Sequence, residues 1–147
     1  MSKKRIYIDT NVLVNYFTKQ PDDVQCLDYL FSKVRKEILF TSSLAVVQAI
    51  SILQTKKKNR IAFSQKKAVE SGEKIYQKFS VIDLVSGDVK NGFQHQNSDV
   101  EDNVHYVLSQ KLKCNVIITN NTNDFNYFAD VIVVSPKETT RLRKMIH

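Results

Sequence analysis

The segment Arg5-Ile6-Tyr7-Ile8-Asp9-Thr10-Asn11 decides the fold of this chain. Its apolar residues 6–8 form a short run of strand type, and the polar triplet that follows is typical of a tight turn. Apolar residues then recur at helical spacing, at Val12, Leu13, Tyr16 and Phe17. The segment therefore predicts a strand, a turn and a helix, with Asp9 at the end of the strand.

The same alternation of short apolar runs and amphipathic stretches continues along the chain. Further strands are expected at 38–40, 79–84, 115–118 and 131–134. Helices are expected over 22–36, 43–54, 61–78 and 87–94, after Ser98, and after Pro136. Such alternation favours a mostly parallel sheet with helices on both faces. We therefore predict an α/β fold, a three-layer α/β/α sandwich, in one domain over residues 1–147.

Two of the expected helices have distinctive sequences. The stretch 43–54 is apolar on nearly every side, which indicates a helix buried between other elements, and Gln48 is its one sizeable interior polar residue. Ser98 and Glu101 have the spacing of a capping box, in which the glutamate bonds back to the cap. We therefore expect a helix to begin at Ser98 and to carry Asp102 in its first turn.

Composition limits the class of protein. The chain has 147 residues, 42% of them hydrophobic, with three glycines and two prolines, which excludes collagenous and disordered classes. The net charge of +7 favours polyanionic partners such as nucleic acid. Basic residues gather at 56–60, where a solvated connection is the simplest interpretation and contact with RNA phosphates is the alternative.

Cysteine usage and hydropathy suggest a location. Cys26 and Cys114 are isolated and belong to no metal-spaced pair, so we expect reduced, buried thiols. The apolar stretch after the basic N-terminal residues is too short to act as a targeting signal or to span a membrane. A soluble, cytoplasmic protein is therefore expected.

Three aspartates from separate segments are candidates for one site. Ligand sites of parallel sheets lie beyond the carboxyl ends of the strands, where Asp9 and the loop 119–124 are expected. Converging carboxylates such as Asp9, Asp102 and Asp124 repel one another unless a cation neutralises them, which suits Mg²⁺ or Mn²⁺. Each also has a structural interpretation: Asp9 as a helix cap, Asp102 as a first-turn acid and Asp124 as a turn residue.

Taken together, these motifs resemble the PIN domain family, in particular its VapC-like toxin ribonucleases. Ile8-Asp9-Thr10-Asn11 is similar to the opening strand and acid of that family. The segment 98–102 looks like its second aspartate motif, and 118–125 looks like its final threonine-to-aspartate loop. The resemblance extends from Arg5 to Val134, with order and spacing in agreement.

The resemblance implies metal-dependent hydrolysis of RNA. Asp9, Asp102 and Asp124 would hold Mg²⁺ or Mn²⁺, which positions a water molecule and stabilises the developing charge on phosphorus. Supporting positions around the metal are implied for Asn11, Gln48, Asp99, Thr119 and Asn121. The implied partners are RNA, a cognate antitoxin and a second copy of the chain, with no membrane.

The chain also departs from the family pattern. Gln48 stands where members often have a glutamate, Asn121 where some have another acid, and Asn120 where toxin-type members commonly have an arginine. An amide neither neutralises a cation nor acts as a base. The alternative hypothesis is therefore a catalytically weakened PIN-like module that binds RNA or protein.

Other chemistries fit the sequence less well. A phosphatase of the haloacid dehalogenase type needs a second aspartate two residues after the first, where this chain has Asn11. A phosphate-binding GxxxxGK[ST] loop is absent from the sequence. His95 and His105 have no metal-ligand partner at i+4, so we expect structural or surface positions for both.

Overall fold

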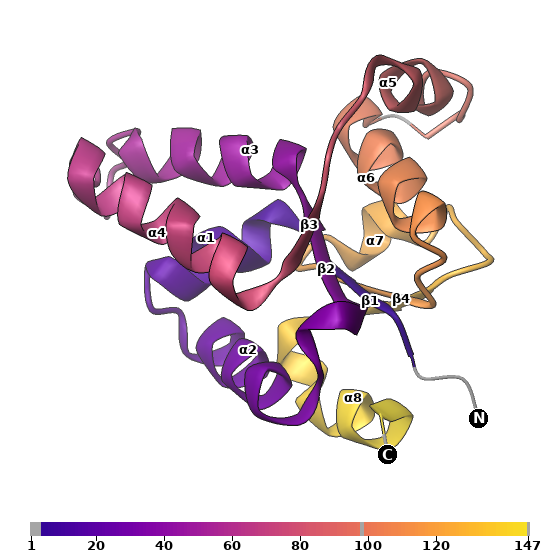
Figure 1. Ribbon diagram of the computed structural model, residues 1–147, viewed down its shortest axis with the longest axis horizontal. Helices are drawn as coiled ribbons and strands as arrows, with labels where there is room; N and C mark the ends of the chain where they lie inside the picture. Colours follow the sequence, from indigo (N-terminus) through magenta and orange to yellow (C-terminus); the bar gives the residue numbers. More distant parts are fainter. Residues whose placement is uncertain (1–3, 98, 147) are drawn as a thin grey trace.

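The computed structural model describes residues 4–97 and 99–146, and its centre is a parallel sheet (Figure 1). Its five strands are β1 (Ile6–Ile8), β2 (Leu39–Ser42), β3 (Ser80–Ile82), β4 (Val116–Ile118) and β5 (Ile132–Val134). They lie in the order β3-β2-β1-β4-β5, and every neighbouring pair is parallel. The predicted parallel sheet is confirmed, with β1 at its centre.

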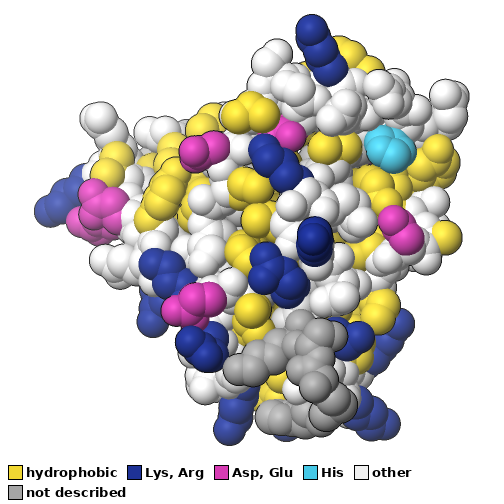
Figure 2. All heavy atoms as spheres, turned by 45° about the vertical axis from the view of Figure 1, so that its right-hand side comes forward, with side chains coloured by type: hydrophobic (Ala, Val, Ile, Leu, Met, Phe, Trp, Pro, Cys, Tyr) yellow, Lys and Arg dark blue, Asp and Glu magenta, His cyan; other side chains and the backbone are white. Residues whose placement is uncertain are grey.

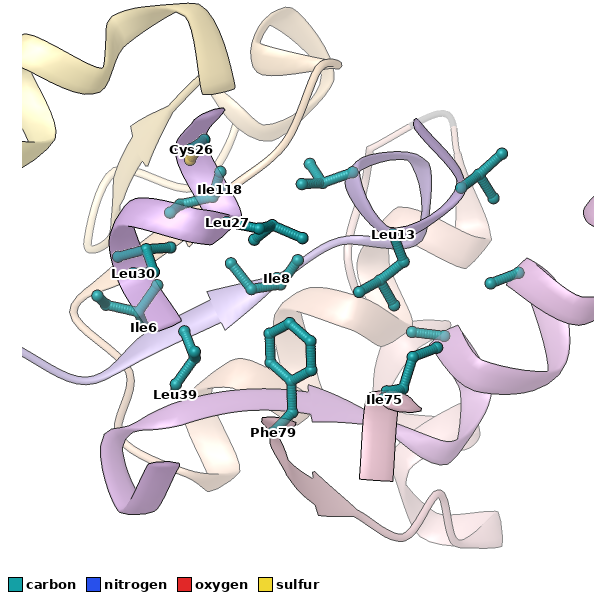
Figure 3. Packing of buried hydrophobic residues seen from close by; sticks show 14 of the residues in the cluster. Ile6, Ile8, Leu13, Cys26, Leu27, Leu30, Leu39, Ile75, Phe79 and Ile118 are labelled. Atoms are coloured by element: carbon teal, nitrogen blue, oxygen red, sulfur yellow. The ribbon is translucent and has the colours of Figure 1, made fainter. Parts of the chain in front are cut away.

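One face of the sheet is covered by the larger group of helices. These are α1 (Thr10–Phe17), α2 (Pro21–Lys33), α3 (Ser43–Gln54), α4 (Gln65–Lys78) and α8 (Thr139–Ile146). Their buried side chains are mainly aliphatic. In Figure 3, Ile6 and Ile8 of β1 face Leu27 and Leu30 of α2, in the same cluster as Phe79.

The opposite face is covered by α5 (Ser86–Gly92), α6 (Val100–Lys111) and α7 (Thr122–Phe125) (Figure 1). Two short 3₁₀ helices, Lys36–Ile38 and Pro136–Glu138, precede β2 and α8. Because side chains alternate along a strand, Tyr7 points to this second face and packs with Leu108 and Phe125. The predicted three-layer α/β/α sandwich is therefore confirmed.

The order of the strands creates a crevice at the centre of the sheet. The chain proceeds outward from β1 to β2 and β3, and then crosses over to β4 and β5 on the other side of β1. Ligands of open parallel sheets bind where this reversal occurs, beyond the carboxyl ends of the strands. Asp9 directly follows β1 and Thr119 directly follows β4, so both lie at this point, as predicted.

Two predicted helix starts were wrong. The helix expected over 61–78 begins at Gln65, because the Ser64 hydroxyl caps it by accepting a bond from Lys67 N at 3.2 Å. The helix expected to begin at Ser98 begins at Val100, with Asp99 as its cap; Ser98 itself lies outside the described residues. Glu101 is exposed, and its predicted capping-box partner is the same Ser98 outside the described residues.

The helix α3 is less enclosed than its sequence suggested. Val47 is 66% exposed, although the stretch 43–54 predicted burial on nearly every side. The two cysteines are free and buried, as expected. Among the residues that the structure describes, no helix is both long and apolar enough to cross a lipid bilayer.

Candidate functional site

An open pocket of about 510 Å³ lies at the carboxyl end of β1, between α1, α3 and α6. Four segments far apart in the sequence contribute its polar lining. The polar lining residues include Asp9, Asn11, Gln48, Asp102, His105 and Asn121. Asp99 and Glu101, at the start of α6, lie on the same lining. The pocket therefore brings two of the three predicted aspartates together at the crevice of the sheet.

Asp9 is fixed by hydrogen bonds on both carboxylate oxygens. Oδ1 accepts from Thr10 N at 2.8 Å, which caps α1. Oδ2 accepts from Thr119 Oγ1 at 2.7 Å and from Asn11 Nδ2 at 3.0 Å. With a side chain only 4% exposed, Asp9 is held at the helix N-terminus, where the partial positive charge favours a carboxylate.

The loop after β4 is tied to the start of α1 by polar side chains. Asn11 Oδ1 accepts from the backbone N of Asn120 at 3.0 Å and from its Nδ2 at 3.1 Å. The same Nδ2 donates to the buried carboxylate of Asp23 at 2.9 Å. Asn11 and Thr119 thus both contact Asp9. The bonds of Asn120 to Asn11 and Asp23 were not predicted.

Asp102 is a buried carboxylate with an unsatisfied oxygen. Its side chain is 6% exposed, and within the described part of the chain Oδ2 has no hydrogen-bond partner. Burial raises the pKa of Asp102 to about 7, and the negative charges of Asp9, Asp99, Asp124 and Glu101 act in the same direction. This corner of the pocket therefore carries uncompensated negative charge.

The third aspartate lies further out. Asp124 is exposed in α7 and is absent from the pocket lining, although its charge contributes to the raised pKa of Asp102. Within the described residues, no group of three or more His, Cys, Asp or Glu side chains is arranged to hold one metal ion. A metal-binding role for all three aspartates stays a prediction.

The donor set nevertheless suits a small divalent cation. Mg²⁺ is commonly bound by one or two carboxylates and keeps several of its water molecules. Asp9 and Asp102 supply two carboxylates, and the unsatisfied Oδ2 of Asp102 is an oxygen ligand without a competing partner among the described residues. A cation between them would also offset the repulsion that raises the pKa of Asp102. The residues present therefore fit such an ion.

His105 was expected at a structural or surface position, yet it is buried in the wall of the pocket. Its side chain is 2% exposed, and Nε2 lies 2.8 Å from Gln48 Oε1 and 3.7 Å from Asp9 Oδ1. Burial lowers the pKa of His105, an effect that the charge of Asp9 opposes. One signal could have located it: residues three apart share a helix face, so His105 lies beside Asp102.

Behind His105, a chain of hydrogen bonds extends into the sheet. Tyr7 Oη lies 2.7 Å from His105 Nδ1 and 2.8 Å from Ser42 Oγ. Burial raises the pKa of Tyr7 well above its ordinary value, so its hydroxyl keeps its proton. Neither Tyr7 nor Ser42 carried a sequence signal for this role, because each lies within or at the end of an apolar strand.

Comparison with known proteins identifies the family of the chain. The model of the PIN domain matches residues 6–131. The chain is 21% identical over 143 residues to Ribonuclease VapC1 of Aquifex aeolicus (strain VF5), and the match covers 94% of each protein.

Two solved structures share the fold at low sequence identity. VapBC-1 from nontypeable Haemophilus influenzae superposes with a TM-score of 0.66 at 14% identity, covering 89% of this chain and 97% of that one. DNA-bound VapBC from Salmonella typhimurium gives a TM-score of 0.66 at 13% identity, covering 90% and 98%. With the family model matched over most of its length, this chain belongs to the PIN domain family.

Proposed function

We propose that this PIN domain chain is a ribonuclease that hydrolyses RNA phosphodiester bonds with carboxylate-bound Mg²⁺ or Mn²⁺. The observation that carries the proposal is the unsatisfied, buried oxygen of Asp102 in the same pocket as Asp9. A cation is the partner that such a pair of carboxylates lacks. The similarity to Ribonuclease VapC1 supports RNA as the substrate.

The surrounding residues have defined parts in this proposal. When bound, the metal would activate water and stabilise charge on the scissile phosphate. Asp9 and Asp102 would hold the metal, with Asp124 at the outer edge of the site. Thr119 and Asn11 keep the Asp9 carboxylate in one orientation through their bonds to Oδ2.

The surface charge is consistent with an RNA substrate. The net charge is +7, and Figure 2 shows Lys and Arg side chains spread over one face of the molecule with fewer acidic ones between them. Positive surface charge raises the local concentration of polyanions and accelerates their encounter with the site.

We further propose that the chain is the toxin of a type II toxin–antitoxin pair in the cytoplasm. The similar structures of VapBC-1 and of DNA-bound VapBC support a cognate antitoxin as its partner. A homodimer is the expected assembly of the toxin. Purification of the chain together with the product of an adjoining small gene, followed by light scattering, tests both partners.

The ribonuclease activity has a direct test. Purified protein with Mn²⁺ should cleave a structured RNA, and Asp9→Asn should reduce the rate at least 100-fold, because the amide cannot neutralise a cation. Glu37→Gln removes one negative charge in the exposed turn before β2, at the opposite end of the sheet, and should leave the rate unchanged. Cleavage that persists in Asp9→Asn would identify a contaminant and contradict the proposal.

A second candidate function is a weakened PIN module that binds RNA without cleaving it. Gln48 favours it, because an amide replaces a carboxylate in the pocket lining. Calorimetric titration separates the two functions. An absence of Mn²⁺ binding up to millimolar concentration, with RNA binding intact, would establish the binding module in place of the nuclease.

A further inference from the structure

The amide oxygen of Gln48 is fully engaged by neighbouring donors. Thr10 Oγ1 donates to Gln48 Oε1 at 2.7 Å, and His105 Nε2 lies 2.8 Å from the same oxygen. An amide oxygen has two lone pairs, so two donors satisfy it. Gln48 Oε1 therefore cannot also bind a metal ion unless one of these bonds breaks.

The position of the proton on His105 follows from its neighbours. Nε2 lies 3.7 Å from the Asp9 carboxylate, whose negative charge favours a proton on that nitrogen. Nδ1 then accepts, and the protonated hydroxyl of Tyr7 is its donor at 2.7 Å. With Nε2 as a donor, the Gln48 atom beside it must be the acceptor oxygen, which fixes the orientation of the amide.

The amide nitrogen of Gln48 is left for the pocket. It lies on the other side of the same carbon from Oε1, and Gln48 lines the pocket together with Asp9 and Asp102. In the described part of the chain, Nε2 has no partner, and it is not among the buried unsatisfied atoms. Position 48 therefore presents two hydrogen-bond donors to the pocket.

We propose that Gln48 binds a non-bridging phosphate oxygen of the RNA backbone through its amide nitrogen, held in orientation by Thr10 and His105. The inference rests on the proposed ribonuclease function, and it assigns Gln48 to substrate binding and not to the metal. A carboxylate at this position would repel the phosphate that the amide attracts. Gln48 is thus a contact to substrate, and His105 is a positioning residue.

Three variants of α3 test the contact. Fluorescence anisotropy with a labelled single-stranded RNA in EDTA measures binding without cleavage. Gln48→Met keeps the length of the side chain but removes the donor, and the Kd should rise about tenfold, the loss expected for one hydrogen bond to a charged group. Gln48→Glu should raise it further through repulsion. Gln54→Glu makes the same change at an exposed position of the same helix and should alter the Kd less than twofold.

The opposite result would overturn the inference. If position 48 is a weakened metal site, Gln48→Glu should bind Mn²⁺ more tightly, cleave faster and bind RNA no less tightly than the unmodified protein. The experiments distinguish a failure of this inference from a failure of the ribonuclease proposal. Asp9-dependent cleavage with unchanged RNA affinity of the Gln48 variants would refute the inference alone, whereas weakened RNA affinity without any cleavage would refute the nuclease alone.

A double-mutant cycle tests the positioning role of His105. His105→Phe keeps a planar ring but removes the Nε2 donor, so the amide of Gln48 loses its fixed orientation and the Kd for RNA should rise. In the Gln48→Met background the same change should cause no further rise, because no donor remains to be oriented. Equal losses in both backgrounds would show a general structural role and contradict the positioning role. The assay temperature is set well below the unfolding midpoint of every variant.

Discussion

The two faces of the central sheet are built from different kinds of side chain. The face under α1 to α4 and α8 is packed with aliphatic groups such as Ile8, Leu27 and Leu30. The face under α6 and α7 holds Tyr7 and aromatic rings, and near the strand ends it also holds the buried polar side chains of Asp102 and His105. The first layer is thus mainly aliphatic, whereas the second also buries an aspartate and a histidine of the pocket.

The two layers contribute to stability in different ways. Buried apolar area stabilises the fold without directional requirements, whereas buried polar groups are costly unless each one finds a partner. Asp102 lacks such a partner for one oxygen among the described residues. The aliphatic layer therefore offsets the cost of burying the Asp102 carboxylate.

The largest expected change in stability is in the aliphatic layer. Leu27→Ala should lower the free energy of unfolding by about 3 kcal/mol, because it leaves a cavity in a fully buried cluster. Urea denaturation monitored by circular dichroism measures the loss. RNA cleavage per folded molecule should stay unchanged, since Leu27 is not part of the pocket lining.

The matched control for Leu27→Ala is Val69→Ala, at a side chain that is 46% exposed in α4. It should change stability by less than about 0.5 kcal/mol. If fully folded Leu27→Ala protein cleaved RNA more slowly, the aliphatic layer would contribute to activity as well as to stability.

A substitution of Asp102 in the site layer should raise the stability of the protein, whereas Leu27→Ala lowers it. The pKa of Asp102 is raised from 3.8 to about 7, so the folded metal-free protein binds a proton that the unfolded chain has already released. Its stability therefore falls as the pH rises from about 4 to about 7. Asp102→Asn stays uncharged and should be more stable than the unmodified protein in EDTA at pH 8, by about 2 kcal/mol once screening by pocket water is allowed for.

Thermal unfolding at several pH values tests this sign. The advantage of Asp102→Asn should shrink as the pH falls from 7 toward 4. Added Mn²⁺ should stabilise the unmodified protein and leave Asp102→Asn unaffected. A variant that is less stable than the unmodified protein at pH 8 would show that the Asp102 carboxylate is compensated within the fold.

A substitution in the hydrogen-bond chain behind the site should have an intermediate effect on stability. Tyr7→Phe removes the hydroxyl between Ser42 and His105 and should lower the free energy of unfolding by about 1 kcal/mol, the typical value for one buried hydrogen bond. Cleavage should fall as well, because the His105 ring loses the donor to Nδ1. An unchanged rate would show that this chain of bonds serves stability alone.

The smallest change is expected at the start of α6. Asp99→Asn keeps an oxygen that can cap the helix, so stability should change by less than about 0.5 kcal/mol. Removing its charge should weaken Mn²⁺ binding slightly, as measured by calorimetry. Asp99→Ala, which also removes the cap, should cost about 1 kcal/mol and serves as the comparison. Equal stability of the two variants would contradict the capping role of Asp99.

The fold could be predicted from the sequence because its signals are local. The change from the apolar run 6–8 to helical spacing after Asp9 is contained in a few residues, and the alternation of such units predicts a parallel sheet. The start of α6 was misplaced for the same reason, since Ser98 and Asp99 are both good helix caps in sequence. The sequence around a helix start does not determine which of two adjacent capping residues is the N-cap.

The candidate site residues were predicted where they follow a strand end or open a helix. Asp9 and Thr119 were found because each ends a parallel strand, and Asp102 because it opens a helix. Gln48 was predicted to support the site, but its hydrogen-bond network with His105 and Tyr7 was missed, because the bond between His105 and Tyr7 joins residues 98 positions apart. These hydrogen bonds form only because folding brings the side chains of β1, α3 and α6 together.

The bond between Thr119 and Asp9 has a consequence for the order of synthesis. These two residues are 110 positions apart, so Asp9 leaves the ribosome long before its partner exists. Local pairs form early in folding, whereas contacts of such long range form only after the intervening chain is complete. A growing chain would therefore expose Asp9 without this partner, and the carboxylate gains the bond from Thr119 only when β4 has entered the sheet.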